Sequence, residues 1–277
     1  MNIQWYPGHM TKAMRTLESN LHLVDIFIEI LDARIPQSSM NPQLGKLAKN
    51  KSRIFLLNKS DLAEPKTTAR WVEYFNRQGF FAIAADLKQN QKSVLLKLIE
   101  GIRLIMSEKV ERQKRRGRIH LPTRAMIVGV PNVGKSTLIN RLAEKASAKT
   151  ADKPGVTRGI QWIKTQGGFD LMDTPGVLWP KFVDPITGIR LAITGAISDN
   201  ILDEIALSEE LISILCEINP NLLITRYKLQ NDISLHEIGN ARGFKIKGGE
   251  IDIKRTAIML LDEFRGGKIG RITLESD

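Results

Sequence analysis

The spacing of apolar residues changes about two-thirds of the way along this 277-residue chain. In the first part, short and nearly continuous apolar runs alternate with segments of helical periodicity, which is typical of a sheet whose strands are covered on both faces. The runs predict strands at Asp25–Leu31, Arg53–Leu57, Phe80–Ala84, Ala125–Gly129, Ile160–Thr165 and Phe169–Met172. The periodic segments predict helices at Lys66–Gln78, Lys92–Ser107 and Lys135–Lys145.

From about Leu178 onward, apolar residues recur at three- and four-residue spacing, which indicates helices. These predicted helices are Leu207–Ile218, Ser234–Arg242 and Lys254–Phe264. The texture changes near Pro180–Pro185. We therefore expect an α/β domain with an N-terminal extension in residues 1–178, with a mostly parallel sheet flanked by helices, and a small all-α domain in residues 179–277.

Composition places the chain among ordinary globular proteins, with 42% hydrophobic and 26% charged residues. No apolar run reaches the length of about 18 residues that a membrane-spanning helix needs. The first twenty residues lack the apolar core of a secretory leader. The single cysteine, Cys216, cannot form an internal disulfide. We expect a cytoplasmic protein with no membrane partner, and a monomer when it is not bound to a larger partner.

The formal net charge of +11 is unevenly distributed. Residues 1–177 contain 29 Lys and Arg against 15 Asp and Glu, whereas residues 178–277 contain 12 against 15. The densest basic run is Lys109–Arg118. Such a run is typical of a surface for a polyanion, although a solvated linker would have the same composition. The excess over the whole first part favours a nucleic acid.

A phosphate-binding loop is the strongest local signal. Gly129-Val130-Pro131-Asn132-Val133-Gly134-Lys135-Ser136 follows a predicted strand and opens a helix, as the pattern GxxxxGK[ST] requires. Its backbone N–H groups would face phosphate oxygens at a helix N-terminus. Lys135 is expected to reach the β- and γ-phosphates and to assist catalysis, and the Ser136 hydroxyl to bind magnesium. The predicted nucleotide contacts in this segment are Asn132, Val133, Gly134, Lys135, Ser136 and Thr137.

A second motif, Asp173-Thr174-Pro175-Gly176, follows the predicted strand that ends at Met172. A carboxylate at that strand end can hold magnesium, and Gly176 N–H can contact the γ-phosphate. Between the two motifs, Thr157 is the residue expected to close over the metal and the γ-phosphate during catalysis. A simple loop threonine remains the alternative for Thr157.

The base is predicted from Asn58-Lys59-Ser60-Asp61, which follows another strand. The Asp61 carboxylate can accept hydrogen bonds from N1–H and the N2 amine of guanine, whereas adenine would leave it unpaired. The Lys59 stem can lie along the base, and Asn58 can tie this loop to the phosphate loop. A backbone N–H at Ala85 can reach guanine O6. GTP and GDP are therefore the expected ligands.

The order of these motifs is rotated. In ordinary small GTPases the phosphate loop comes first, but here Asn58–Asp61 precedes it. The same sheet forms if the usual termini are joined and the chain is cut elsewhere. The loop that senses the γ-phosphate then leads directly into residues 179–277, and we hypothesise that GTP loading repositions that helical part.

The rotated order, the N-terminal Trp5-Tyr6-Pro7-Gly8-His9-Met10 and the segment Asp32-Ala33-Arg34-Ile35-Pro36 resemble circularly permuted GTPases of the YlqF/RbgA type over the whole chain. The resemblance implies a bacterial GTPase that acts in late assembly of the large ribosomal subunit. It also implies that ribosomal RNA is bound, that the C-terminal helical domain binds RNA, and that the large subunit stimulates hydrolysis.

Val177 stands where many GTPases carry a glutamine that orients the attacking water. Intrinsic hydrolysis should therefore be slow. The resemblance implies that the N-terminal Pro-Gly-His segment supplies the missing group, which here is His9; contact with RNA is the alternative for this residue. It also implies that Asn132 helps to bind a potassium ion, with a loop-capping asparagine as the alternative.

Two other functions remain open. One is a nucleotide-gated RNA-binding scaffold with negligible hydrolysis, which stays open because Val177 stands in place of the water-orienting glutamine. The other is a GTPase that acts on a different RNA. A local excess of basic residues lies in the helical part, although that part is acidic overall; the residues are Arg242, Lys245, Lys247, Lys254 and Arg255.

Overall fold

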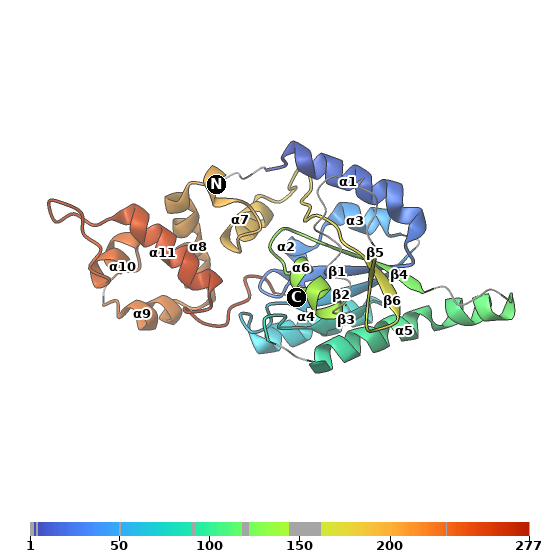
Figure 1. The fold of residues 1–277 in the computed structure, drawn as a ribbon. Coiled ribbons are helices and arrows are strands. Elements are labelled where there is room, and N and C mark those ends of the chain that lie inside the picture. The colour runs from blue at the N-terminus through green and yellow to red at the C-terminus, as the bar shows by residue number, and fades with distance from the viewer. Residues whose placement is uncertain are drawn as a thin grey trace.

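The computed structural model describes residues 3, 5–49, 51–89, 92–117, 122–143, 162–230 and 232–276. Within this part of the chain one six-stranded sheet has the order β3-β2-β1-β4-β6-β5 (Figure 1). Its strands are β1 Ile26–Asp32, β2 Ser52–Asn58, β3 Phe81–Ala84, β4 Thr123–Gly129, β5 Trp162–Lys164 and β6 Phe169–Met172. All neighbours are parallel except β5, which runs antiparallel to β6.

Helices cover both faces of the sheet. The side chains of Phe27 and Phe55 face α1, α3 and α4, while those of Ile28 and Ile127 face α5 and α6. The helices of this part are α1 Gly8–Asn20, α2 Pro36–Ser39, α3 Pro42–Leu47, α4 Pro65–Arg77, α5 Lys92–Arg115 and α6 Lys135–Leu142. Because β1 is buried along its whole length, its residues are apolar on both faces apart from Glu29 and Asp32.

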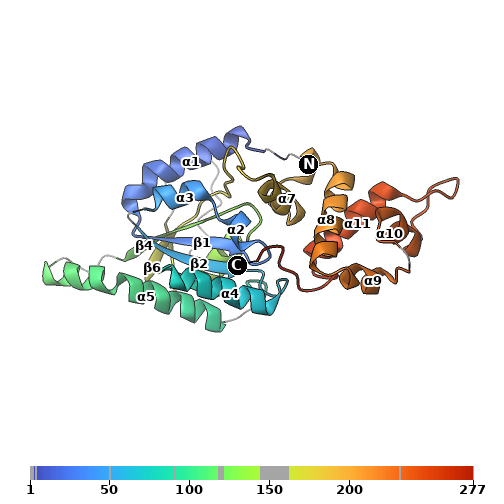
Figure 2. The same cartoon turned by 180° about the vertical axis from the view of Figure 1, so that it is seen from behind.

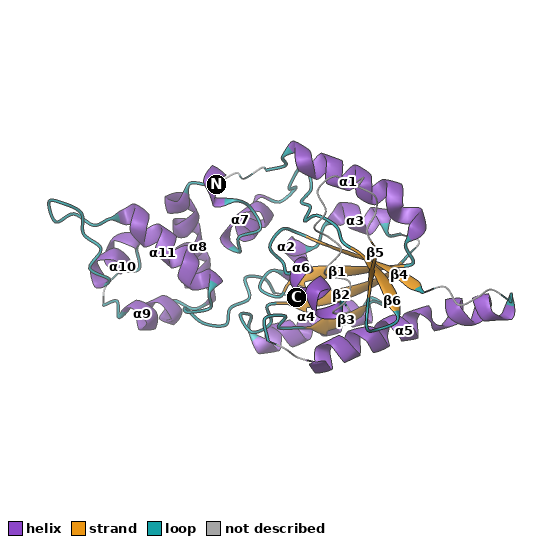
Figure 3. Ribbon diagram, viewed as in Figure 1, coloured by secondary structure: helices purple, strands orange, loops and turns teal. Residues whose placement is uncertain are grey.

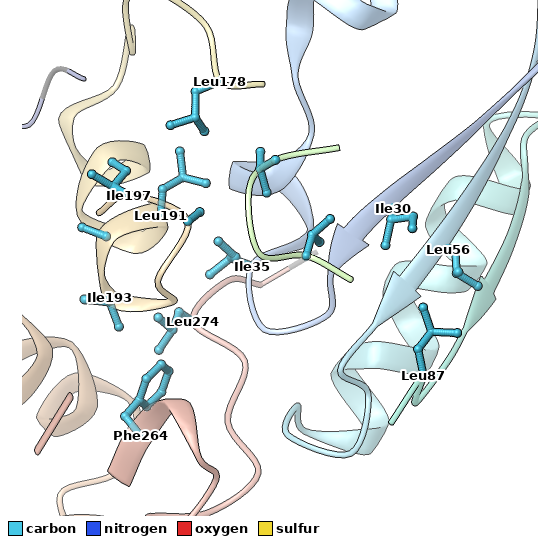
Figure 4. Packing of buried hydrophobic residues seen from close by; sticks show 14 of the residues in the cluster. Ile30, Ile35, Leu56, Leu87, Leu178, Leu191, Ile193, Ile197, Phe264 and Leu274 are labelled. Atoms are coloured by element: carbon cyan, nitrogen blue, oxygen red, sulfur yellow. The ribbon is translucent and has the colours of Figure 1, made fainter. Parts of the chain in front are cut away.

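The remaining helices are α7 Pro185–Ile193, α8 Glu204–Ile218, α9 Asn221–Tyr227, α10 Leu235–Ala241 and α11 Ile253–Arg265. They stand together on one side of the sheet, as the colouring by secondary structure shows (Figure 3). Figure 4 shows one apolar cluster that runs from the sheet into this helical part and includes Ile35, Leu178, Leu191, Phe264 and Leu274. The helical part is therefore packed against the sheet by a continuous core, and its division from the rest at residue 178 stays a proposal.

The predicted strands are present, with ends that differ by at most two residues. Two residues predicted to open β5, Ile160 and Gln161, lie outside the described residues. One interpretation was wrong: Lys109–Arg115, which we considered as a linker, forms the last two turns of α5. The helical spacing of buried apolar residues in α5 stops at Met106. The sequence pattern therefore predicted the end of the helix where its buried face ends.

Helices α1, α2, α3, α7 and α9 were not predicted. Helix α1 is amphipathic and buries Met10, Met14 and Leu17 against the sheet. Helix α7 is short and begins with Pro185, whose fixed φ suits the first helical position, behind the capping side chain of Asp184. Helices α2, α3, α7 and α9 are short and give too few turns for a clear apolar period.

Candidate nucleotide-binding site

The sequence motifs follow neighbouring strands at the same edge of the sheet. The phosphate loop follows β4, the Asp173 motif follows β6, and Asn58 ends β2. Parallel strands place their carboxyl ends together, and ligands bind beyond that edge in open α/β sheets. The fold therefore brings the three motifs together although up to 118 residues separate Asn58 from Gly176 in the sequence.

Two glycines of the phosphate loop hold conformations that a side chain would not allow. Gly134 has φ +108°, and a Cβ there would lie 2.3 Å from the Asn58 Nδ2 atom. Gly129 has φ +150°, and its Cβ would lie 2.6 Å from the Ile30 carbonyl oxygen. Because glycine occupies both positions, the loop can turn and can closely approach Asn58–Asp61, which we call the base-recognition segment.

A pocket of about 740 Å³ opens between the phosphate loop, the Asp173 motif and the N-terminal segment. Its lining residues are Trp5, His9, Met10, Pro131, Asn132, Gly134, Lys135, Ser136, Thr137, Asp173, Thr174, Pro175 and Gly176. Gly176 packs tightly here, since an added Cβ would lie 2.7 Å from both Lys135 Nζ and Pro131 Cα. The pocket thus joins the residues predicted to bind phosphate with His9.

Lys135 is buried at the floor of this pocket. Its Nζ donates to the Val130 carbonyl at 2.8 Å and to the Gly129 carbonyl at 3.2 Å. Burial lowers the pKa of Lys135 from 10.5 to about 8, against the opposing charge of Asp173. Burial also raises the pKa of Asp173, although the Thr174 N–H bond and the Lys135 charge oppose this. An anion entering the pocket would compensate the buried lysine charge.

We expect GDP binding to weaken as pH rises through about 8. Nucleotide phosphates favour the charged form of Lys135, so binding above that pH must take up a proton. The dissociation constant should rise about fivefold to tenfold between pH 7.5 and 9. Fluorescence titration with a labelled GDP measures this. The Lys135→Met variant should bind GDP weakly, and its dissociation constant should change with pH only through titration of the guanine base. An equally steep rise of the dissociation constant in that variant would contradict the role of Lys135.

His9, the second residue of α1, lines the pocket and is in edge contact with Trp5, with ring centroids 6.4 Å apart. Val177 is fully buried, and its N–H donates to the Gly129 carbonyl at 3.2 Å. Its side chain is therefore inside the core and not in the pocket. Of the two residues, only His9 lines the pocket.

The base-recognition segment is tied to the phosphate loop as the sequence predicts. The Asn58 amide donates to the Val133 carbonyl at 2.7 Å and accepts from Leu87 N–H at 3.0 Å. Lys59 has a left-handed backbone, with φ +61°, and its Nζ contacts Asp32 Oδ2 at 2.8 Å. Among the described residues, the Asp61 carboxylate has no hydrogen-bond or ionic partner, so it is available to a base.

Ala85 differs from its expected role. Its N–H donates to the Leu57 carbonyl at 2.8 Å, and its carbonyl accepts from Ser60 N–H at 3.0 Å. The amide that we expected to meet guanine O6 is therefore occupied in extending the sheet past β3. Ala85 holds the base-recognition segment through Ser60. Thr157 lies outside the described residues.

The structure adds a buried ion-pair network beneath the base-recognition segment. Arg34 contacts Asp32 through two hydrogen bonds, of 2.9 Å and 2.7 Å, and donates to the Thr194 carbonyl at 3.3 Å. Although burial alone would raise the pKa of Asp32, the charges and hydrogen bonds of Arg34 and Lys59 hold that pKa well below its ordinary value. The sequence shows the Asp-Ala-Arg segment, but not that it would meet Lys59.

Comparisons with known proteins agree with this geometry. A family model described as 50S ribosome-binding GTPase matches residues 124–226. That stretch begins at the strand before the phosphate loop and excludes Asn58–Asp61, as a rotated motif order requires. Among curated proteins, Ribosome biogenesis GTPase A of Priestia megaterium is 45% identical, over 99% of this chain and 97% of its own length.

More distant relatives also match over nearly the full length. Ribosome biogenesis GTPase A of Thermotoga maritima is 32% identical, over 99% of this chain and 94% of its own length. The structure of GNP-bound YlqF from T. maritima is 28% identical, with a TM-score of 0.67, over 96% of this chain and 98% of that one. A GDP-bound structure of TM YlqF gives a TM-score of 0.69 over 95% and 99%.

Proposed function

This chain belongs to the ribosome biogenesis GTPase A family of circularly permuted GTPases, and from that premise we propose that it acts in late assembly of the large ribosomal subunit. It is a GTPase that binds guanine nucleotides. In the proposal, the GTP-bound protein binds ribosomal RNA and leaves when GTP is hydrolysed. A cytoplasmic location follows from that role; among the described residues, no helix is long and apolar enough to cross a membrane.

One observation carries the proposed coupling: the phosphate loop touches the helical part directly. The Asn132 side chain donates through Nδ2 to the Gly195 carbonyl, just after α7, at 2.8 Å. The preceding carbonyls of that helix end accept from Arg34 and Arg265. A change in the phosphate loop on GTP binding therefore acts on the same helix terminus that joins α11 to the sheet.

The pocket residues support a mechanism of phosphoryl transfer to water. Lys135 is positioned to neutralise charge on the β- and γ-phosphates, and Gly176 N–H to contact the γ-phosphate. Ser136 and Asp173 are exposed residues that line the pocket and carry oxygen ligands of the kind that magnesium prefers; the ion would supply charge neutralisation between the phosphates. His9 would accept a hydrogen bond from the attacking water. We also propose, from the sequence alone, that Thr157 closes over the γ-phosphate.

Potassium fits the Asn132 side chain without breaking its contact. Nδ2 is the atom that donates to Gly195, so the Oδ1 atom is the one that would face a cation beside the phosphates. The left-handed backbone of Asn132, with φ +58°, places this side chain at the rim of the pocket. We propose a potassium contact there, in place of the arginine that other GTPases insert.

The proposed RNA surface includes the free end of α5. Its last two turns carry Arg112, Lys114 and Arg115, all exposed, and Arg116 follows. In Figure 1 this end of the helix extends past the sheet, away from α7–α11. Phosphate groups of an RNA backbone are the natural partners of such a projecting basic helix.

Reversing charge at this helix end should weaken binding to large subunits. For Lys114→Glu/Arg115→Glu we expect at least a tenfold loss of affinity at low salt, because each lost phosphate contact removes part of the counterion release. The matched control is Lys92→Glu/Lys97→Glu, at the other end of the same helix. Co-sedimentation with purified large subunits over a range of salt concentrations measures both. Equal loss in the two variants would contradict a specific role for the basic end.

The same assay tests the GTP dependence of the proposal. With a non-hydrolysable GTP analogue the protein should co-sediment with large subunits, and with GDP it should remain in the supernatant. Equal binding in the two states would overturn the proposed release on hydrolysis. The second candidate function, a nucleotide-gated RNA-binding scaffold with negligible hydrolysis, would instead show GTP-dependent co-sedimentation without turnover on the subunit; the buried Val177 side chain is the observation that favours it.

A further inference from the structure

The last described residues of the chain return from α11 to the base-recognition segment. Figures 1 and 2 show this tail leaving the helical part and ending beside the sheet. We define the C-terminal tail as Arg271–Glu275. Three of its residues, Ile272, Leu274 and Glu275, are buried, so it is held in place along its length. A buried terminal segment that crosses between two parts of a molecule needs a reason.

The tail bonds to the loop that carries Asp61 from one side. The Arg271 guanidinium donates to the Ser60 carbonyl at 2.8 Å and to the Ala63 carbonyl at 3.0 Å. Ile272 N–H donates to the Leu62 carbonyl at 2.9 Å. The carbonyls on both sides of Asp61 are therefore fixed by the tail.

A second set of contacts extends this arrangement. Glu64 N–H donates to the Thr273 hydroxyl at 3.1 Å. Leu274 N–H donates to the carbonyl of Arg34, the residue that is paired with Asp32, at 2.8 Å. Asp32 in turn holds Lys59. The tail thus contacts the base-recognition segment directly, through the carbonyls beside Asp61, and indirectly, through the ion pairs that hold Lys59.

The far end of the tail is anchored to α2 and α7. The Glu275 carboxylate accepts from Gln37 N–H at 2.7 Å, from Ser38 N–H at 3.0 Å and from the Ser38 hydroxyl. Arg190 of α7 approaches the same carboxylate at 3.3 Å. Because the Glu275 carboxylate is buried and paired, it fixes the position of the tail from which Arg271 and Thr273 make their hydrogen bonds.

We propose that the C-terminal tail takes part in guanine recognition, with Arg271 as the residue that positions the loop that carries Asp61. The loop has no regular secondary structure, so binding a base would otherwise require ordering it. A guanidinium that bridges two carbonyls fixes their separation and direction, which a lysine cannot do with the same geometry. This inference rests on the proposed role of Asp61 and does not depend on the ribosome.

The test compares GDP with IDP, which lacks the N2 amine of guanine. A correctly placed Asp61 carboxylate should favour GDP, because it accepts two hydrogen bonds from guanine and one from hypoxanthine. For Arg271→Ala we expect the ratio of the two affinities to fall about threefold to tenfold, with Arg271→Lys in between. Lys268→Ala removes an equal charge from an exposed position just before the tail and should leave the ratio unchanged.

Equilibrium titration of the full chain with labelled nucleotides measures these ratios. If the ratio for Arg271→Ala stays within twofold of the starting protein, the proposal is overturned, whether or not both affinities fall together. Asp61→Asn serves as the benchmark: if it too keeps the ratio, the base site itself has been misplaced. Should Arg271→Ala fail to fold, Thr273→Val gives the second reading, with a smaller fall expected and an unchanged ratio again overturning the proposal.

Discussion

Replacing Asp61 by asparagine should weaken GDP binding by about 10²- to 10³-fold, the largest change in affinity that we expect. In the proposed base site the carboxylate would accept two hydrogen bonds from guanine, each charge-assisted and worth about 1.5–3 kcal/mol. An asparagine amide offers one acceptor and one donor, so its NH₂ group would face a donor of the base. The loss should therefore be nearly the sum of one bond and one repulsive contact.

The same substitution should create a preference for xanthosine diphosphate. Xanthine carries a carbonyl in place of the N2 amine, which the asparagine NH₂ group can meet. Titrating the starting protein and Asp61→Asn with both nucleotides gives an internal control, because a damaged fold would lose affinity for both. If Asp61→Asn kept the starting protein's preference for GDP over xanthosine diphosphate, the assignment of Asp61 to the base would be contradicted.

Replacing His9 by alanine should lower subunit-stimulated turnover by about 10²-fold or more, which is the range for a positioned general base. GTP affinity should change little, because His9 lies at the rim of the pocket and the phosphate loop is intact. The effect should fall on kcat, since the water is oriented only in the reacting complex. Steady-state hydrolysis in the presence of large subunits separates kcat from KM.

The matched control for His9 is His22, an exposed histidine that follows the far end of α1 and does not line the phosphate pocket. His22→Ala should keep full stimulated turnover. Full turnover in His9→Ala, with normal GTP affinity, would exclude the catalytic role and leave RNA contact as the function of that segment.

The strands and the phosphate loop could be predicted because their signals are local. Strand β1 is buried on both faces, so its sequence is apolar almost throughout, and the loop needs glycine at Gly129 and Gly134 for its own backbone. The meeting of Asn58 with the phosphate loop could also be expected, since both follow strands of one parallel sheet.

Other parts of the site depend on contacts between distant segments. The pairing of Lys59 with Asp32 follows from the adjacency of β1 and β2 and not from spacing in the sequence, whereas Asp32 and Arg34 lie close together in one segment. The return of Arg271 to the base-recognition loop has no signal in composition or periodicity. Ala85 was assigned a free amide because its segment ends a strand, but the backbone continues the sheet pairing by one residue.

We propose that this GTPase hydrolyses GTP faster when it is bound to the large ribosomal subunit than when it is alone. Single-turnover hydrolysis of GTP, measured with and without large subunits and with immature as well as mature particles, tests it most directly. We predict slow hydrolysis by the protein alone, because Val177 is buried in the core, and at least tenfold faster hydrolysis with subunits. A rate that is unchanged by either particle would contradict the account.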